Sequence, residues 1–332
     1  MPNKTYVIAE MACSHEGEVE LAKKIIDASA FAEADAVQLQ IWNHKYMISP
    51  NRKEYSLLKD IELNKEEWID IVDYSKKNHP NIDLIVCAYE HHSIDFINTL
   101  NINGFKLNSS DLSNPLILEK VAETKKTINL SVGASSIEEI QKALEIISRK
   151  NGGKVNLMYG FQNFPTKPEE VNLSFMRKIS KLFELPIGYQ DHSDAEEASA
   201  FWLPAMSLGL GASIIEKHIT HDRSLKGIDH ESALDPVEFV DFVKMVRMLD
   251  KAFGEAKPRS FSKSEIVYRN FQKKSLVATR NLMKGEKLME IDTAFMRSNK
   301  IGIKPIDSKD YFGKSLVNDI KAYDSICNED LV

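Results

Sequence analysis

Eight short apolar runs alternate with amphipathic segments along residues 1–253, and each run ends in or beside a polar residue. Runs that are rich in β-branched residues and separated by helical patterns are typical of parallel strands buried on both faces. Eight such units predict an α/β fold, the (β/α)₈ TIM barrel. The predicted strands are residues 5–13, 36–41, 83–89, 104–108, 127–132, 155–161, 186–191 and 213–219.

Signals between the runs mark helix starts and one long loop. Ser135 and Ser193 each stand three residues before a glutamate, which is the spacing of a capping box. Asp235 followed by Pro236 is typical of a helix start and predicts the last barrel helix there. Residues 42–65 are long for a barrel connection, and long loops of this kind often cover a site.

The pattern changes after Phe253. Residues 254–265 are polar and contain Gly, Pro and Ser, which favours a linker. Short strand-like pieces such as residues 275–279 follow, and they indicate a second, small domain that would be marginal alone. We expect a barrel over residues 1–258, a linker over 259–272 and a mostly β domain over 273–332. Residues 254–268 are expected to be extended enough to carry the tail to a neighbouring subunit.

Composition limits the class of partner. The chain of 332 residues carries a net charge of −6 and has a pI near 5.9, which argues against a nucleic-acid-binding surface. Cys13, Cys87 and Cys327 are widely spaced and odd in number, so free thiols in a reducing cytoplasm are expected. The chain has no apolar run near the ~18 residues of a membrane span and no secretory pattern. We expect a cytoplasmic protein with neither a nucleic-acid nor a membrane partner.

Two histidines are the leading candidates for a metal site. His192 follows the seventh predicted strand and His218 ends the eighth. Active sites of TIM barrels lie at the carboxyl ends of the strands, so the two side chains should come within reach of one ion. Two imidazoles suit Mn²⁺, Zn²⁺ or Fe²⁺ and leave positions open for water or substrate. The alternative is two unrelated polar residues on the barrel rim.

Charged residues within apolar runs are further candidates. Lys106 lies in a buried context where an unpaired ammonium is costly; it can bind a phosphate or carboxylate, form a Schiff base, or belong to a structural ion pair. Glu10 must pair with a cation or exchange a proton. Lys217 faces the other side of its strand from His218 and ranks lower.

Polar residues outside the strands add weaker signals. Ser109 and Ser131 can donate hydrogen bonds to an anion, although serine after a strand is also a common helix cap. Asp229 lies eleven residues past His218, in a loop over the same barrel mouth. A charged loop residue is either solvated or part of the site.

Taken together, the motifs resemble the sialic acid synthase (N-acetylneuraminate or nonulosonate synthase) family over nearly the whole chain. The segment RNFQKKSLVATRNLMKGEKL (269–288) resembles that family's C-terminal antifreeze-like, or SAF, domain. The other matching segments are IAEMACSHEG (8–17), DAVQLQ (35–40), FKLNSSDLSN (105–114), LSVGASSIEEI (130–140), FPTKPEEVNL (164–173), IGYQDHS (187–193) and IIEKHIT (214–220).

The resemblance implies an enzyme, a transferase that condenses phosphoenolpyruvate with an open-chain N-acylated amino sugar. The products would be a nine-carbon 2-keto sugar acid and phosphate. It also implies a divalent metal, Mn²⁺ or Mg²⁺, on His192 and His218, and a domain-swapped homodimer in which Arg297, with Phe271, reaches the sugar of the partner's site. Glu10, Lys106 and Asp229 are then expected to be catalytic. The residues expected to bind substrate are Gln38, Gln40, Cys87, Ser109, Ser131, Gln162, Phe164, Gln190, Phe271 and Arg297.

Four positions depart from the family pattern in the region that would hold phosphoenolpyruvate. Gln38 stands where the family usually has Lys, Cys87 replaces Thr, Gln162 replaces Asn before Phe164, and Gln190 replaces Ser. Two alternatives therefore stay open. The chain can be a divergent relative that uses another three-carbon donor or another acceptor, or a non-catalytic barrel that binds a sugar acid.

Overall fold

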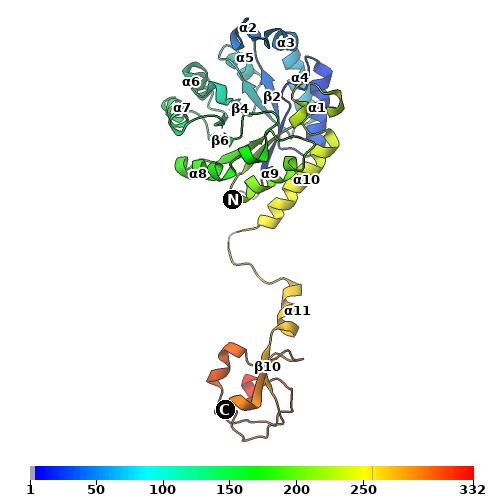
Figure 1. The fold of residues 1–332 in the computed structure, drawn as a ribbon, viewed down its shortest axis with the longest axis vertical. Helices are drawn as coiled ribbons and strands as arrows, with labels where there is room; N and C mark the ends of the chain where they lie inside the picture. Colours follow the sequence, from blue (N-terminus) through cyan, green and yellow to red (C-terminus); the bar gives the residue numbers. More distant parts are fainter. Residues whose placement is uncertain (1–3, 256) are drawn as a thin grey trace. The chain divides into compact units, whose positions relative to one another are not determined.

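The computed structural model describes residues 4–255 and 257–332 (Figure 1). The chain divides into two compact units, Met1–Glu255 and Ala256–Val332, and each is described by itself. The first unit is a closed barrel of eight strands that pair in chain order, and all its ladders are parallel. The predicted TIM barrel is therefore confirmed.

All eight predicted strands are present. Their ends differ from the prediction by up to three residues, most of all at the first strand, which stops at Glu10 because Ala12 adopts a left-handed backbone conformation. The Glu10 carboxylate accepts a hydrogen bond from the Ala12 N–H and stabilises that turn. The strands are β1 (Tyr6–Glu10), β2 (Ala36–Ile41), β3 (Asp83–Ala88), β4 (Gly104–Leu107), β5 (Thr127–Ser131), β6 (Val155–Tyr159), β7 (Ile187–Asp191) and β8 (Ile214–His218).

Helices connect the strands. Two short ones, α2 (His44–Met47) and α3 (Tyr55–Asp60), lie within the long connection after β2, and short 3₁₀ helices occupy Ser109–Asp111, Pro168–Glu170, Arg223–Leu225 and His230–Ser232. The remaining helices of the unit are α1 (Val19–Phe31), α4 (Lys65–Asn78), α5 (Ile94–Thr99), α6 (Pro115–Glu123), α7 (Ile137–Arg149), α8 (Leu173–Phe183), α9 (Ser199–Gly209) and α10 (Pro236–Phe253).

Two of the three predicted helix starts differ from the structure. The capping box of α7 is formed by Ser136 with its glutamate at the third position, one residue later than expected. Ser193 starts no helix, because its hydroxyl donates instead to the Asp191 carboxylate, and α9 begins only at Ser199. The start at Asp235 and Pro236 is confirmed, with a capping box at the first turn of α10.

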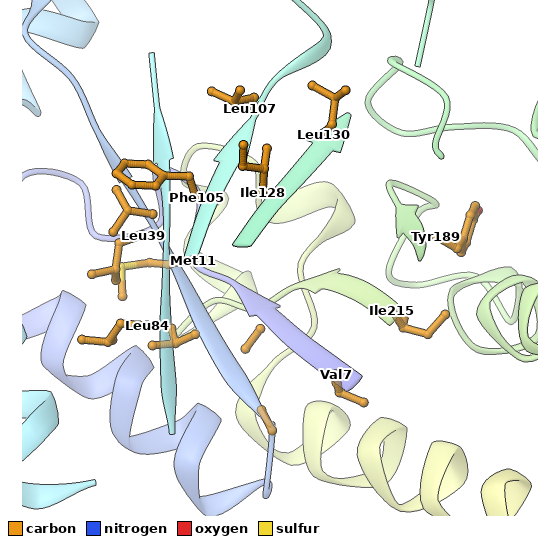
Figure 2. Packing of buried hydrophobic residues seen from close by; sticks show 14 of the residues in the cluster. Val7, Met11, Leu39, Leu84, Phe105, Leu107, Ile128, Leu130, Tyr189 and Ile215 are labelled. Carbon is orange, nitrogen blue, oxygen red and sulfur yellow. The ribbon is translucent and has the colours of Figure 1, made fainter. Parts of the chain in front are cut away.

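Outward-facing strand residues form the main core between the barrel and its helices. Phe105 on β4, Ile128 and Leu130 on β5 and Ile215 on β8 are fully buried there (Figure 2). Full burial of a side chain of this size stabilises a fold by about 1.5–3 kcal/mol. Because successive strand residues point to opposite faces, this outer packing also fixes which residues face the inside of the barrel.

The inside of the barrel is closed by a small apolar cluster, which we call the plug. It consists of Ile8, Ala36, Ile85, Met158 and Ile214, from five different strands, with Tyr6 packed against it. Two residues further towards the carboxyl ends, β1, β2 and β8 carry the polar residues Glu10, Gln38 and Glu216. The plug thus separates two mouths of the barrel, and the polar residues that line the carboxyl mouth stand directly above it.

Within its described residues, the second unit contains one α-helix and one two-stranded antiparallel sheet. The sheet pairs β9 (Ser275–Ala278) with β10 (Thr293–Met296), so the predicted strand at 275–279 is confirmed. Its small core is formed by Leu276, Ala278, Leu282, Leu288, Ile303, Leu316, Ile320 and Ile326. Short 3₁₀ helices occupy Glu290–Asp292, Pro305–Asp310 and Asn328–Asp330.

The stretch expected to be extended, residues 254–268, is interrupted by a helix that begins at Lys263. Residues Lys263–Gln272 form α11, which starts at a capping box between Ser262 and Glu265. Polar composition suggested an extended chain, but the cap satisfies the backbone N–H groups that a helix start leaves free. The helix buries none of its side chains within the unit and exposes Ile266, Val267, Tyr268 and Phe271.

The three thiols agree with the expectation from composition. Cys13, Cys87 and Cys327 are all free. Within the described residues, none of the helices combines the length and the apolar character that crossing a bilayer requires.

His15 generates a pH prediction. It is fully buried against Trp42 and Trp68, and burial lowers its pKa to about 4. Unfolded histidine protonates near pH ~6.5, so the free energy of unfolding should fall as the pH drops from there towards 4, by roughly 2 kcal/mol at pH 5. His15→Asn retains an acceptor for the Gly17 N–H but does not titrate. Urea unfolding at pH 7 and 5 should show the larger loss in the wild type; equal losses would contradict this origin.

A candidate active site at the carboxyl mouth of the barrel

A cavity of about 410 Å³ opens at the carboxyl ends of the strands. Its walls contain eleven of the residues proposed from the sequence, which come from six strands and their following loops. The structure thus brings together residues that are up to 219 positions apart in the chain. These residues are Glu10, Gln38, Gln40, Lys106, Ser109, Gln162, Phe164, Gln190, His192, His218 and Asp229.

Four other proposed residues are not in this wall. Cys87 is buried beside the cavity, and burial holds the pKa of its thiol well above the ordinary value. Ser131 is fully buried, and its hydroxyl exchanges hydrogen bonds of 3.1 and 2.9 Å with the Gln190 amide. Ser131 therefore orients a lining residue without reaching the cavity itself. Phe271 and Arg297 belong to the second unit, where both are exposed.

Glu10 is held by amides. Its Oε1 atom accepts hydrogen bonds from Gln40 Nε2 at 2.8 Å and from the Ala12 N–H at 2.7 Å, and the Gln38 amide contacts Oε2. Burial, followed by the charge of Glu216, raises the pKa of Glu10 to about 8. Of the two roles open to a buried carboxylate, pairing with a cation and exchanging a proton, these direct contacts favour the second.

Lys106 forms a buried ion pair with Glu216. The two side chains are 2% and 4% exposed and come from β4 and β8. The contact matches the third alternative for Lys106, a structural ion pair. An ammonium engaged in this way is less available for Schiff-base chemistry, which requires a free amine. Glu216 was not among the residues proposed from the sequence. Its position could have been predicted, because the alternation of strand residues places Glu216 on the same face of β8 as His218.

The two histidines lie side by side above this pair. Their ring centroids are 5.2 Å apart at an interplanar angle of 69°. His192 Nδ1 donates to the Phe161 carbonyl at 2.8 Å, which leaves the lone pair of Nε2 free. Burial lowers the pKa of both imidazoles, and for His218 the neighbouring His192 lowers it further. Two neutral imidazoles are suitable ligands for a divalent metal.

Among the described residues, the two histidines do not belong to a larger cluster of potential metal ligands. Within the described residues, no group of three or more His, Cys, Asp or Glu side chains is arranged to hold an ion. The residues present therefore fit an ion held by two imidazoles, with its other positions available to substrate oxygen atoms or water.

Asp229 enters the cavity from the loop after β8. It has a left-handed backbone, with φ 64°, and burial raises the pKa of its carboxyl. The next residue, His230, is 1% exposed and its Nε2 atom lies 2.8 Å from Thr220 Oγ1. The Ser232 hydroxyl donates to the His192 carbonyl at 2.8 Å. The loop is thus tied to the ends of both histidine-bearing strands, and these ties position Asp229.

The long connection after β2 forms an apolar wall that sequence reasoning did not resolve into residues. As expected for a loop of that length, it covers one side of the cavity, with Trp42 anchored by a hydrogen bond from Nε1 to the Leu58 carbonyl. The hydroxyl of Tyr89, which also lines the cavity, donates to Gln40 Oε1 at 2.7 Å. The wall residues from this connection are Trp42, Met47, Glu54, Leu57 and Leu58.

Comparison with known proteins gives consistent matches. Residues 25–258 match the model of the NeuB family. An uncharacterized protein of Methanocaldococcus jannaschii is 32% identical over 99% of this chain and 95% of its own length. N,N'-diacetyllegionaminic acid synthase of Campylobacter jejuni is 31% identical over 96% of this chain and 97% of its own. The crystal structure of a sialic acid synthetase from Leptospira borgpetersenii, in complex with citrate, has a TM-score of 0.73 and 30% identity, over 80% of this chain and 91% of that one.

Proposed function

Because the chain belongs to the NeuB family, whose named relatives are synthases that form carbon–carbon bonds, we propose that it condenses phosphoenolpyruvate with an open-chain N-acylated amino sugar. The product is a nine-carbon 2-keto sugar acid of the sialic acid type. The chain is thus an enzyme, a transferase, and the identity of its two substrates is the part that we propose.

One observation carries this proposal. A buried ammonium, a buried carboxyl and two neutral imidazoles share one cavity at the carboxyl mouth of a TIM barrel, in Lys106, Glu10, His192 and His218. The imidazoles suit a divalent metal. The ammonium suits the carboxylate or phosphate of a three-carbon donor, and the carboxyl suits proton exchange with the sugar.

His192 and His218 would hold Mn²⁺ or Mg²⁺, which supplies polarisation of the sugar aldehyde when it is bound. In the reaction, C3 of phosphoenolpyruvate forms a bond to the aldehyde carbon, and the aldehyde oxygen takes up a proton. Water adds at C2, the bond between C2 and the phosphate oxygen breaks, and phosphate leaves. Lys106 holds the donor, and Glu10 and Asp229 exchange protons with the sugar hydroxyl and the water.

A second candidate function is condensation with a three-carbon donor of smaller negative charge. Lys106 is the sole cation among the described residues that line the cavity, and Glu216 already neutralises it. Phosphoenolpyruvate brings a carboxylate and a phosphate into that space. Gln38, Gln162 and Gln190, which line the donor region, offer neutral amides. This balance favours a donor that is bound mainly through hydrogen bonds.

The metal and the donor are tested together. We expect Mn²⁺ to bind by calorimetry, and phosphate to be released when phosphoenolpyruvate is supplied with a panel of N-acylated amino sugars. His192→Ala and His218→Ala should each lose both signals, because each removes one of two protein ligands. His230→Asn, which changes a buried histidine of the same mouth that does not line the cavity, should still bind Mn²⁺.

The outcomes separate the candidates. If both alanine variants bind Mn²⁺ as the wild type does, the two-histidine site is wrong. If Mn²⁺ binds and phosphoenolpyruvate is neither bound nor consumed with any sugar, the donor differs and the second candidate holds. A chain that binds a sugar acid equally well with and without His192, and turns over none of these substrates, would instead be a non-catalytic binder.

We also propose that residues 273–332 form an SAF domain that completes the site of a second subunit in a homodimer. The exposed guanidinium of Arg297, directly after β10, suits recognition of the sugar's N-acyl carbonyl by paired donors. The exposed side chains of α11, such as Val267 and Phe271, leave apolar surface that contact with another chain would bury.

Mixed dimers test this arrangement. An Arg297→Ala chain combined with a His192→Ala chain should regain partial activity, because one of the two hybrid sites then has both residues intact. The double variant Arg297→Ala/His192→Ala, mixed with wild type, provides the matched control for subunit exchange. Mixed dimers that form without regaining activity would show that each tail serves its own barrel or does not reach a site.

A further inference from the structure

The barrel has a second cavity, of about 590 Å³, at its amino-terminal mouth. Ile85 and Ile214 line it and also belong to the plug, so the cavity lies below the plug. The residues that give it its chemistry are Tyr6, Asp83, Thr127, Asn129, Lys154 and Asn156. Most of them belong to the barrel strands, where the outer packing fixes the backbone.

Two buried amides form its floor. Asn129 on β5 and Asn156 on β6 are 2% and 5% exposed. Asn156 Nδ2 donates to Asn129 Oδ1 at 2.9 Å, and Asn156 Oδ1 has no hydrogen-bond partner within the described residues. Each amide has one acceptor oxygen and two N–H donors, so this single contact leaves most of their capacity unused.

Such amides are unexpected at these positions. Inward-facing residues of a TIM barrel are mostly Val, Ile and Leu, which fill the space and leave no polar atom unpaired. A buried polar group without a partner costs free energy and calls for an explanation. Hydrogen bonds to a molecule in the cavity would use the capacity that the fold leaves open.

The cavity offers an anion one cation, Lys154, that pairs with no carboxylate of the described residues. Both Asp83 oxygens are engaged within the protein, by the Tyr6 hydroxyl at 2.6 Å and by the Asn103 amide at 2.7 Å. Lys4 contacts Asp35. Lys154 forms no ion pair within the described residues and is exposed at the mouth. A carboxylate is the simplest partner for this free ammonium.

We propose that the amino-terminal mouth is a second binding site, for a small hydroxylated carboxylic acid. The carboxylate pairs with Lys154, and the hydroxyl groups bond to Asn129, Asn156 and Thr127. A cavity of this volume lies within the usual range for small-molecule sites. Since the plug separates the two mouths, the molecule does not contact the residues of the carboxyl mouth, and the inference is independent of the reaction proposed there.

The test uses two probes that differ in one group. D-gluconate carries a carboxylate and a chain of hydroxyl groups, and D-sorbitol carries the hydroxyl groups alone. Calorimetry on the full chain should show saturable binding of gluconate and weaker binding of sorbitol. His192→Ala, which alters the carboxyl mouth only, should bind gluconate as the wild type does.

Three substitutions address the site itself. Asn156→Leu replaces the amide by an apolar group of similar size and should abolish gluconate binding. Lys154→Gln should weaken it about tenfold, the loss of one charge-assisted contact. Thr127→Val removes one hydroxyl at constant size and should weaken binding less; it keeps the site testable if Asn156→Leu fails to fold, as judged by circular dichroism.

Three results would overturn the site. One is the absence of saturable gluconate binding to the wild type. Another is binding that His192→Ala abolishes, which would place gluconate at the carboxyl mouth. The third is binding that Lys154→Gln and Thr127→Val leave unchanged. Equal affinity for gluconate and sorbitol would overturn the assignment of an acid as the ligand.

Discussion

The buried ion pair between Lys106 and Glu216 is the interaction on which the carboxyl mouth depends. The two residues come from β4 and β8, which are four strands apart in the closed barrel, and they meet directly above the apolar plug. Removing one partner of such a pair leaves a buried, uncompensated charge, which costs about 3–5 kcal/mol. The pair also acts on Glu10, since the charge of Glu216 raises the pKa of that carboxyl and the charge of Lys106 lowers it. The position of the Lys106–Glu216 pair therefore affects the protonation of Glu10.

A second buried pair holds the strands that carry the histidines. Lys217 and Asp191 are both fully buried, with Lys217 Nζ 2.6 Å from Asp191 Oδ2. Asp191 also accepts from the Tyr189 hydroxyl at 2.9 Å and from the Ser193 hydroxyl at 2.6 Å. Each member of the pair directly precedes one of the two histidines, on the opposite face of its strand. The Lys217–Asp191 pair therefore fixes β7 and β8 to each other at the level where His192 and His218 face the cavity.

The sequence predicts the barrel well because its strands are continuous apolar runs, a signal that does not depend on distant contacts. It also places most of the site. Successive strand residues alternate between the two faces of the barrel wall, and TIM-barrel active sites lie at the carboxyl ends of the strands, so Glu10, Lys106 and His218 are assigned to one mouth. Alternation gives the face of a strand but not the depth, and so Ser131 is expected in the wall and is found beneath Gln190. Alternation also places Glu216 at this mouth, but its pairing with Lys106 does not follow from the sequence, because the two residues lie 110 positions apart.

Local polar contacts explain the other differences. A side-chain bond to Asp191 keeps Ser193 from starting a helix, and a capping box turns much of the expected linker into α11. Composition does not reveal either contact. The residues of the apolar wall could not be predicted from the sequence either. Loop residues such as Trp42 and Leu58 are positioned by the fold and follow no periodic pattern.

The dependence of the carboxyl mouth on the Lys106–Glu216 pair can be measured by a double-mutant cycle on the free energy of unfolding. Lys106→Met and Glu216→Gln should each destabilise the chain by about 3–5 kcal/mol, because each strands a buried charge or polar group. The double variant should lose clearly less than the sum, since no uncompensated charge remains. If the two losses simply add, the residues act independently, and the carboxyl mouth does not depend on their pairing.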